Sequence, residues 1–312
     1  MSVNRQQDLP ACVRHPDRPT GLRCVRCDRP ACPDCLQPAS VGFQCVDCVA
    51  EGSKTVREAR TVAGARARQG IRPMVVVPVL IGLNVLVFGI TAFQAQSIVE
   101  NQRSSVFIDG TLIPGLVASG DYWRLLTSGF LHFGNYGGYG PVHLVFNMFA
   151  LYVLGRDLEV ALGRMRFVVV YMLSLFGGST AVMLFGDALS SVAGASGAIY
   201  GLFGGIAVVV FRAEMNPTPV LVLLGINIFL SVALPGISLL GHLGGLVVGA
   251  AATAALVYAP RGKNLVRFQV WACVGLAVVL VAVLALRLSM MDVSCELTSV
   301  EGFIRCTGDL GS

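Results

Sequence analysis

Residues 194–201 read Gly-Ala-Ser-Gly-Ala-Ile-Tyr-Gly and place a hydroxyl group between small residues in an otherwise apolar chain. Polar residues Ser190 and Ser191 precede this stretch, and an apolar run continues from Ser196 to about Val210. Small neighbours allow another helix or a substrate backbone to approach the hydroxyl closely. In membrane helices, however, such a sequence is more often a packing notch than a reactive site. A catalytic interpretation therefore requires a base and an oxyanion site within reach of Ser196.

The composition is that of a membrane protein. The chain has 312 residues, of which 54% are hydrophobic and only 13% are charged, and its mean hydropathy is +0.71. These values exclude an ordinary soluble domain and indicate a helical protein with several membrane spans. The apolar character is uneven, because residues 1–72 are polar and rich in cysteine. We therefore predict an all-α polytopic membrane protein preceded by a small module of a different kind.

Seven apolar runs are long enough to cross a hydrocarbon layer of about 30 Å. They fall near residues 74–95, 141–157, 166–185, 196–211, 217–234, 238–258 and 268–289. With the N-terminus inside, the inner loops contain the basic residues Arg156, Arg164, Arg166, Arg212, Arg261, Lys263 and Arg267, whereas the outer loops after the third and fifth runs contain none. The positive-inside rule thus predicts a plasma-membrane protein with a cytoplasmic N-terminus and an extracytoplasmic C-terminus.

Four parts of the chain follow from this pattern. We expect a metal-binding module over residues 1–50, a basic juxtamembrane linker over 51–73, a transmembrane domain over 74–290 and an extracytoplasmic tail over 291–312. The linker contains Lys54, Arg57, Arg60, Arg66, Arg68 and Arg72. It is either a simple solvated connection or a basic anchor that also contacts anionic lipid.

The first part of the chain has the spacing of a zinc site. Four pairs of ligands, each separated by two residues, are Cys12 and His15, Cys24 and Cys27, Cys32 and Cys35, and Cys45 and Cys48. Zinc takes four nitrogen or sulfur ligands in a tetrahedron, so eight ligands predict two structural zinc ions. The short gap between Cys27 and Cys32 favours a cross-braced arrangement, in which the first pair shares an ion with the third and the second with the fourth. This spacing resembles a B-box zinc finger.

A disulfide framework is the alternative for these cysteines, but it does not suit a cytoplasmic segment. Arginines alternate with Asp17, Asp28 and Asp34, which is typical of a solvated surface rather than of a nucleic-acid-binding face. We therefore expect the module to bind a protein partner or to regulate the membrane domain, and we expect no nucleic-acid partner. In the tail, Cys295 and Cys306 lie on the predicted oxidising side and are candidates for a disulfide bond.

Polar groups inside membrane helices are costly and indicate a functional site. His143 and Asn147 lie four residues apart, and hence on one face of the second predicted span. Together with Ser196 and His242, they occur near the predicted outer ends of their spans. A stripe of glycines at Gly241, Gly245 and Gly249 permits close packing of the helix that carries His242. The four polar groups therefore predict one site at a common depth.

The same groups have the chemistry of a serine hydrolase without an acidic third member. Asp157 and Glu159, the carboxylates on the second span, fall at its inner end. We expect neutral His242 to accept the proton of Ser196 and to return it to the leaving amine. His143, Asn147 and the backbone N–H of Ser196 are candidates to stabilise the oxyanion. No cofactor is expected for this catalysis.

At these residues the chain resembles the rhomboid family of intramembrane serine proteases. The resemblance covers residues 74–290 and rests on Trp123-Arg124, His132, His143-x3-Asn147, Gly194-x-Ser196-Gly197 and His242-x2-Gly245-x3-Gly249. It implies a rhomboid-like core of six helices with a seventh appended at the C-terminal end. It also implies that Ser196 and His242 form the catalytic dyad, that His143 and Asn147 serve the oxyanion, and that Tyr200 packs on the catalytic histidine. The segment 135–141 is longer than the minimal family pattern, and Gly241 replaces a common alanine.

We thus expect a serine endopeptidase that cleaves single-span membrane proteins within or beside their span, in contact with the lipid bilayer. Gly194 and Gly197 would support Ser196 by leaving room around it. One alternative is a non-proteolytic, rhomboid-like scaffold that binds transmembrane segments. Another is a transporter that uses the histidines as a proton relay, but the sequence shows no paired mid-membrane carboxylates and no inverted repeat.

Overall fold

The computed structural model describes residues 9–55, 61–64, 74–135, 141–234, 236–297 and 304–308. The chain divides into two compact units, Met1–Ala59 and Arg60–Ser312. Most of the basic linker, and residues 136–140 of the lengthened segment before the second span, lie outside the described residues.

The first unit is a small module with little apolar core. A 3-10 turn, η1 (Pro33–Cys35), leads into an antiparallel pair of short strands, β1 (Leu36–Pro38) and β2 (Phe43–Cys45), and helix α1 (Val46–Thr55) follows. Its buried cluster consists of six cysteines and Ala31. So small an apolar core cannot stabilise a fold of this size, which is why such modules usually depend on bound metal. Helix α1 continues past residue 50, the predicted boundary between the module and the linker.

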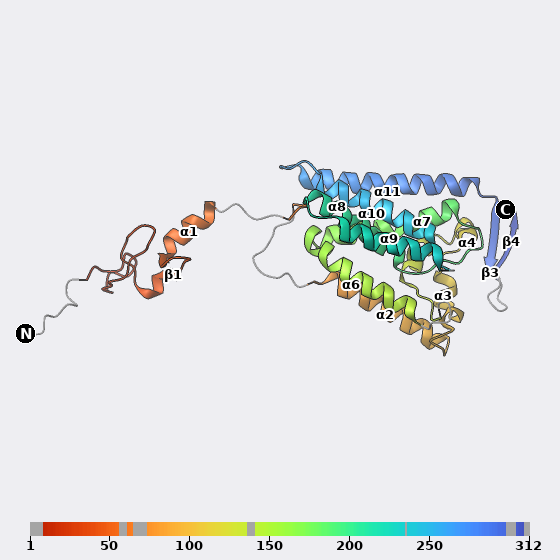
Figure 1. Cartoon of the computed structure of the whole chain (residues 1–312), viewed down its shortest axis with the longest axis horizontal. Helices are drawn as coiled ribbons and strands as arrows, with labels where there is room; N and C mark the ends of the chain where they lie inside the picture. The colour runs from red at the N-terminus through yellow and green to blue at the C-terminus, as the bar shows by residue number, and fades with distance from the viewer. Residues whose placement is uncertain are drawn as a thin grey trace, which may run out of the picture. The chain divides into compact units, whose positions relative to one another are not determined.

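The second unit contains seven long helices among its described residues (Figure 1). They are α2 (Val76–Gln94), α6 (Val142–Leu162), α7 (Arg164–Phe185), α8 (Ser196–Arg212), α9 (Thr218–Ala233), α10 (Leu239–Val257) and α11 (Leu265–Met290). They coincide with the seven apolar runs. Helices α2, α7, α10 and α11 are long and apolar enough to cross a membrane, while α8 and α9 are shorter apolar helices. The chain is therefore a mostly helical integral membrane protein.

Close packing of α10 against α7 and α8 forms the centre of this bundle (Figure 1). The contact depends on glycine, because a Cβ at Gly245 would overlap the backbone of Gly197, and one at Gly249 would overlap the backbone of Gly201. Main chains can approach this closely only where neither helix carries a side chain. The glycine stripe thus sets the separation of the two helices that carry Ser196 and His242.

A compact segment of short helices connects α2 to α6. It contains η2 (Asn101–Arg103), α3 (Ser105–Gly110), α4 (Pro114–Ala118), α5 (Arg124–Thr127) and η3 (Ser128–Phe130). Arg124 is almost fully buried, binds Asp121 and donates to the carbonyls of Ile108 and Thr111. Trp123 donates its indole N–H to the Asp109 carbonyl. These contacts give the Trp-Arg pair a structural role in holding the segment together.

After α11, within the tail predicted over residues 291–312, the chain forms a hairpin of β3 (Val293–Leu297) and β4 (Ile304–Gly308). Cys295 and Cys306 are opposite each other in the register and form a disulfide bond. The Cys295 N–H donates to the hydroxyl of Ser119, and Cys295 packs with Ile113 and Leu116. The hairpin is therefore held against α4, in the segment between the first two long helices.

Candidate active site

Ser196 is the first residue of α8, directly after an extended segment. Val192 in that segment pairs with Leu112 through two backbone hydrogen bonds. Gly194 follows with φ +134°, a conformation that side chains disfavour, and its N–H donates to the Ser128 carbonyl. As the first residue of the helix, Ser196 has a backbone N–H without an intrahelical acceptor. The backbone thus presents both the hydroxyl and the N–H of Ser196 at the end of α8.

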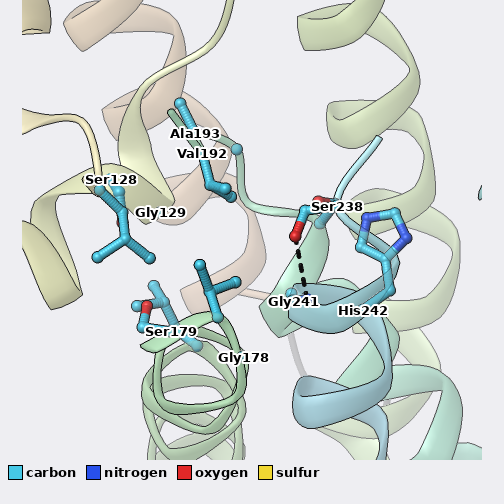
Figure 2. Close-up of a pocket in the computed structure, with 15 residues that line it drawn as sticks. Ser128, Gly129, Gly178, Ser179, Val192, Ala193, Ser238, Gly241 and His242 are labelled. Carbon is cyan, nitrogen blue, oxygen red and sulfur yellow. Dashed lines mark hydrogen bonds between the residues drawn. The ribbon is translucent and has the colours of Figure 1, made fainter. Parts of the chain in front are cut away.

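A cavity of about 30 Å³ available to water lies beside Ser196, with room for roughly two water molecules. Ser196, Gly197 and His242 line this cavity together with Gly241 and Gly194. Figure 2 shows Ser238, Gly241 and His242 on one side of it and Ser128 and Gly129 on the other. The structure thus brings the predicted nucleophile and base to one small cavity that is large enough to admit water.

His242 is the fourth residue of α10 and is 7% exposed. Ser238 caps this helix by accepting a hydrogen bond from the Gly241 N–H (Figure 2). The imidazole stacks on the ring of Tyr200, with 4.0 Å between ring centroids. Its Nδ1 lies 2.8 Å from the hydroxyl of Ser231 on α9, and this hydroxyl lies 2.7 Å from that of Tyr200. The ring is therefore held both by its face and through Nδ1.

The predicted oxyanion residues lie on α6, and the ring of His143 approaches Gly194 in the wall of this cavity. A Cβ built on Gly194 would lie 2.9 Å from the His143 ring and 3.6 Å from the Ser196 hydroxyl, so the two side chains lie on the same side of Gly194. Asn147 is one turn further along the helix and donates to the His143 carbonyl. Its amide group has a second N–H, which this bond leaves for another acceptor. Neither His143 nor Asn147 is among the residues that line the cavity itself.

His132 lies behind these residues, in the segment before α6. It is 1% exposed, its ring centroid is 5.1 Å from that of His143, and its Nε2 is 3.5 Å from the Ala195 N–H. Asn101 binds the His132 carbonyl and fixes the backbone here. His132 thus supports the segment around Ser196 and has no direct contact with the cavity.

Ser231 is a site residue that no sequence pattern indicates. A serine within an apolar helix is common and usually returns a hydrogen bond to its own backbone, as Ser231 does to the Asn227 carbonyl. Its exceptional feature is burial, because it is the buried residue of α9, a helix whose other faces are largely exposed. Only the three-dimensional contact with His242 connects it to the site.

The first unit contains two groups of metal-ligand side chains. Cys12, His15, Cys32 and Cys35 form one, and Cys24, Cys27, Cys45 and Cys48 form the other; within each, the ligand atoms lie within 4.8 Å of one another. These are the two sets that the cross-braced spacing predicts, and the cysteines in them are not disulfide-bonded.

The geometry of both groups fits zinc. Tetrahedral Zn–S bonds of about 2.3 Å place two sulfur ligands about 3.8 Å apart. The sulfurs of Cys27 and Cys45 are 3.8 Å apart, and His15 Nδ1 lies 3.4 and 3.3 Å from the sulfurs of Cys32 and Cys35. Hydrogen bonding with Cys27, together with burial, raises the pKa of Cys48 to about 12. The pKa values of Cys12 and Cys24 are instead lowered to about 6, because the effect of burial, which raises them, is outweighed by backbone hydrogen bonds. Metal binding requires the thiolate form of each ligand, and a divalent cation would offset the repulsion between thiolates.

Comparison with known proteins shows that part of the membrane unit is similar to rhomboid proteins. Residues 119–259 match the family model described as Rhomboid domain. The chain is 37% identical over 146 residues to Rhomboid protease GluP of Bacillus subtilis (strain 168), covering 45% of this chain and 27% of GluP. It is 33% identical over 147 residues to RHOMBOID-like protein 4 of Arabidopsis thaliana, covering 45% and 35% of the two chains.

A longer alignment joins this chain to Rhomboid protease AarA of Providencia stuartii, at 25% identity over 225 residues, covering 63% of this chain and 78% of AarA. The alignments span only 27% and 35% of the lengths of GluP and RHOMBOID-like protein 4. The domain match includes Ser196, His242, His143 and Asn147, whereas both groups of metal ligands lie outside it.

Proposed function

We propose that this chain, which carries a rhomboid domain over residues 119–259 and has homologues named as rhomboid proteases, is an intramembrane serine endopeptidase. Ser196 is the nucleophile and His242 is the general base. The observation that carries the proposal is that these two side chains, from α8 and α10, line one small cavity that admits water. A packing notch would instead be filled by the facing helix.

In the proposed reaction, His242 accepts the proton of the Ser196 hydroxyl as its oxygen attacks a peptide carbonyl. The ring then gives this proton to the departing amine, and an acyl ester remains on Ser196. Water entering the cavity attacks the ester with His242 again as base, which releases the new carboxylate and restores the serine. Stacking on Tyr200 keeps the imidazole in place through both steps.

The developing oxyanion requires hydrogen-bond donors that already point at it. The backbone N–H of Ser196, the His143 ring beside Gly194 and the second N–H of Asn147 are the donors that we assign. A mobile loop would have to order these donors at each turnover. Here they project from the first turns of α6 and α8, so little reorganisation is needed.

The proposed substrates are single-span membrane proteins. A bound helix must unwind to expose a peptide carbonyl, so small or helix-breaking residues at the cleavage point should favour reaction. A cavity of about 30 Å³ cannot hold a peptide segment, and a substrate must therefore displace part of its lining. We place the site toward the outer face of the plasma membrane, with the first unit in the cytoplasm and the C-terminal hairpin outside.

The experiment is labelling of detergent-solubilised protein with a fluorophosphonate probe, together with cleavage of a model single-span substrate in liposomes. Wild-type protein should react in both assays, and Ser196→Ala and His242→Ala should react in neither. Ser190→Ala is the matched control, because Ser190 lies in the segment before α8 but does not line the cavity. It should behave as wild type.

Two outcomes would overturn the proposal. Equal cleavage by wild type and Ser196→Ala would assign the activity to another residue or to a contaminant. A folded wild-type protein that is not labelled, but has the same cellular effect as Ser196→Ala, would favour the scaffold that binds transmembrane segments without cleaving them.

For the first unit, we propose a structural module over residues 1–50 that binds two zinc ions and contacts a protein partner. The zinc ions would stabilise the module and take no part in peptide hydrolysis. Deletion of residues 1–50 should leave fluorophosphonate labelling intact but change the set of proteins recovered with the chain. Loss of labelling would instead show that the membrane unit needs this module.

A further inference from the structure

The hydroxyl of Ser231 lies at the meeting point of three hydrogen-bonding groups. It is 2.8 Å from the Asn227 carbonyl, 2.7 Å from the Tyr200 hydroxyl and 2.8 Å from Nδ1 of His242. Ser231 is 4% exposed and belongs to α9, whereas Tyr200 and His242 belong to α8 and α10. Three helices therefore contribute to one buried polar cluster next to the dyad.

The proton count in this cluster favours one tautomer of His242. A serine hydroxyl has one proton and two lone pairs, and a carbonyl can only accept. All three contacts are satisfied when Ser231 donates to Asn227 and accepts from the other two groups. Tyr200 then donates through its O–H and His242 through Nδ1–H. If Ser231 donated to Nδ1 instead, its oxygen and the Asn227 carbonyl oxygen would face each other without a proton between them.

We infer that Ser231 is a positioning residue that holds His242 in the Nδ1–H tautomer and so leaves Nε2, the other ring nitrogen, as the unprotonated base for Ser196. Serine proteases with a carboxylate third member fix the tautomer by the same device, with an acceptor at Nδ1. In this chain a neutral hydroxyl supplies the acceptor, so no charge has to be buried in the membrane. The inference rests on the proposed function.

The tautomer itself can be measured without any assay of activity. In protein labelled with 15N at histidine, the nitrogen shifts distinguish a protonated ring nitrogen from a bare one, and the His242 signals are those missing from His242→Ala. Wild type should show Nδ1 protonated and Nε2 bare, and Ser231→Ala should show a mixture of tautomers. A wild-type spectrum with Nε2 protonated would overturn the inference.

Kinetics give the second arm of the test. Ser231→Ala should lower kcat roughly tenfold with little change in KM, because the base is then correctly oriented for only part of the time. Ser231→Thr keeps the hydroxyl and should stay within about threefold of wild type. The matched control is Ser174→Ala. Ser174 also has a buried hydroxyl that donates to its own helix, but it does not belong to the hydrogen-bonded cluster of Ser231, Tyr200 and His242.

The outcomes separate this inference from the proposed function. Failure of wild type to react with the probe would overturn the protease assignment, whereas the 15N spectrum would still report the tautomer. A reactive wild type with equal kcat in Ser231→Ala would overturn only the role of Ser231. If Ser231→Ala does not fold, the wild-type spectrum and the kcat of Ser231→Thr still decide.

Discussion

The ring of Tyr200 lies face to face with the imidazole of His242, with 4.0 Å between centroids and 15° between planes. Tyr200 is one turn after Ser196 on α8, so the helix that presents the proposed nucleophile also supports the proposed base. The stack on Tyr200 holds one face of the imidazole. The contact between Nδ1 and the Ser231 hydroxyl holds one edge of the same ring.

Two variants of Tyr200 test whether its ring or its hydroxyl contributes to kcat. Tyr200→Ala removes the stack and should lower kcat about fivefold, because such stacks are worth about 1 kcal/mol and 1.4 kcal/mol is tenfold in rate. Tyr200→Phe keeps the ring and should lose less than about threefold. Tyr258→Ala, which removes an exposed tyrosine at the other end of α10, is the control. Equal loss in the alanine and phenylalanine variants would contradict the stacking role.

Glycine contacts should determine both stability and activity. Gly245→Ala would push a methyl group into the Gly197 backbone, which cannot rotate away. We expect a loss of about 2 kcal/mol in the free energy of unfolding. Because a shift of about 1 Å in reacting groups can cost a hundredfold in rate, kcat should fall by about that factor. Gly275→Ala is the control, since a Cβ there has open space. Normal kcat in Gly245→Ala would show that the helix separation is not critical.

A buried carboxylate anchors the first long helix. Glu159 on α6 is 4% exposed and accepts the N–H groups of Val75, Val76 and Val77 at the start of α2. Glu159→Ala should lower the free energy of unfolding by at least about 3 kcal/mol, because hydrogen bonds to a charged group are worth about 1.5–3 kcal/mol each. Thermal melting in detergent would measure the loss.

Glu159→Gln retains one acceptor oxygen and should lose about half as much. Asp157→Ala removes an exposed carboxylate on the same turn and should change stability by less than about 0.5 kcal/mol. Equal destabilisation by Glu159→Ala and Asp157→Ala would argue against the anchoring role.

Local sequence patterns were sufficient where local chemistry decides the structure. Apolar runs located the long helices because a membrane allows only helices there, and the two-residue ligand spacing located the metal groups because each pair binds as one unit. The second span was placed to end at residue 157, whereas α6 continues to Leu162. Charged residues near position 157 predict the end of the span in the sequence. The helix continues past them because the buried carboxylate of Glu159 accepts hydrogen bonds from the N–H groups at the start of α2.

Long-range contacts were not predictable in this way. The docking of Cys295 on α4 joins segments that are far apart in the chain, and no periodicity in either segment indicates it. Ser231 likewise has an unremarkable local sequence, and its contact with His242 depends on how α9 and α10 pack. These positions acquire their contacts from tertiary packing, which explains why neither the docking of the hairpin nor the contact between Ser231 and His242 could be predicted from the sequence.

Metal content tests the first unit. Purified wild type should contain close to two zinc ions per chain by elemental analysis. Cys45→Ser removes a ligand from one group and should bring the content to about one, whereas Cys273→Ser, in α11, should leave it unchanged. Acidification should release zinc, because the thiols must lose their protons to bind it and regain them at low pH. A wild-type content near one would contradict two independent sites.

The disulfide of the C-terminal hairpin should control how firmly the hairpin holds α4. Closing a loop of 11 residues removes chain entropy worth about 3 kcal/mol from the open state. Reduction, or Cys306→Ser, should therefore increase hydrogen exchange in β3 and around Ser119, whose hydroxyl accepts from the Cys295 N–H. The buried cluster around Cys295 consists of residues outside α10, so exchange in α10 should not change. Cys273→Ser controls for loss of a thiol elsewhere. Unchanged exchange near Ser119 after reduction would mean that packing on Ile113 and Leu116 holds the hairpin without the covalent link.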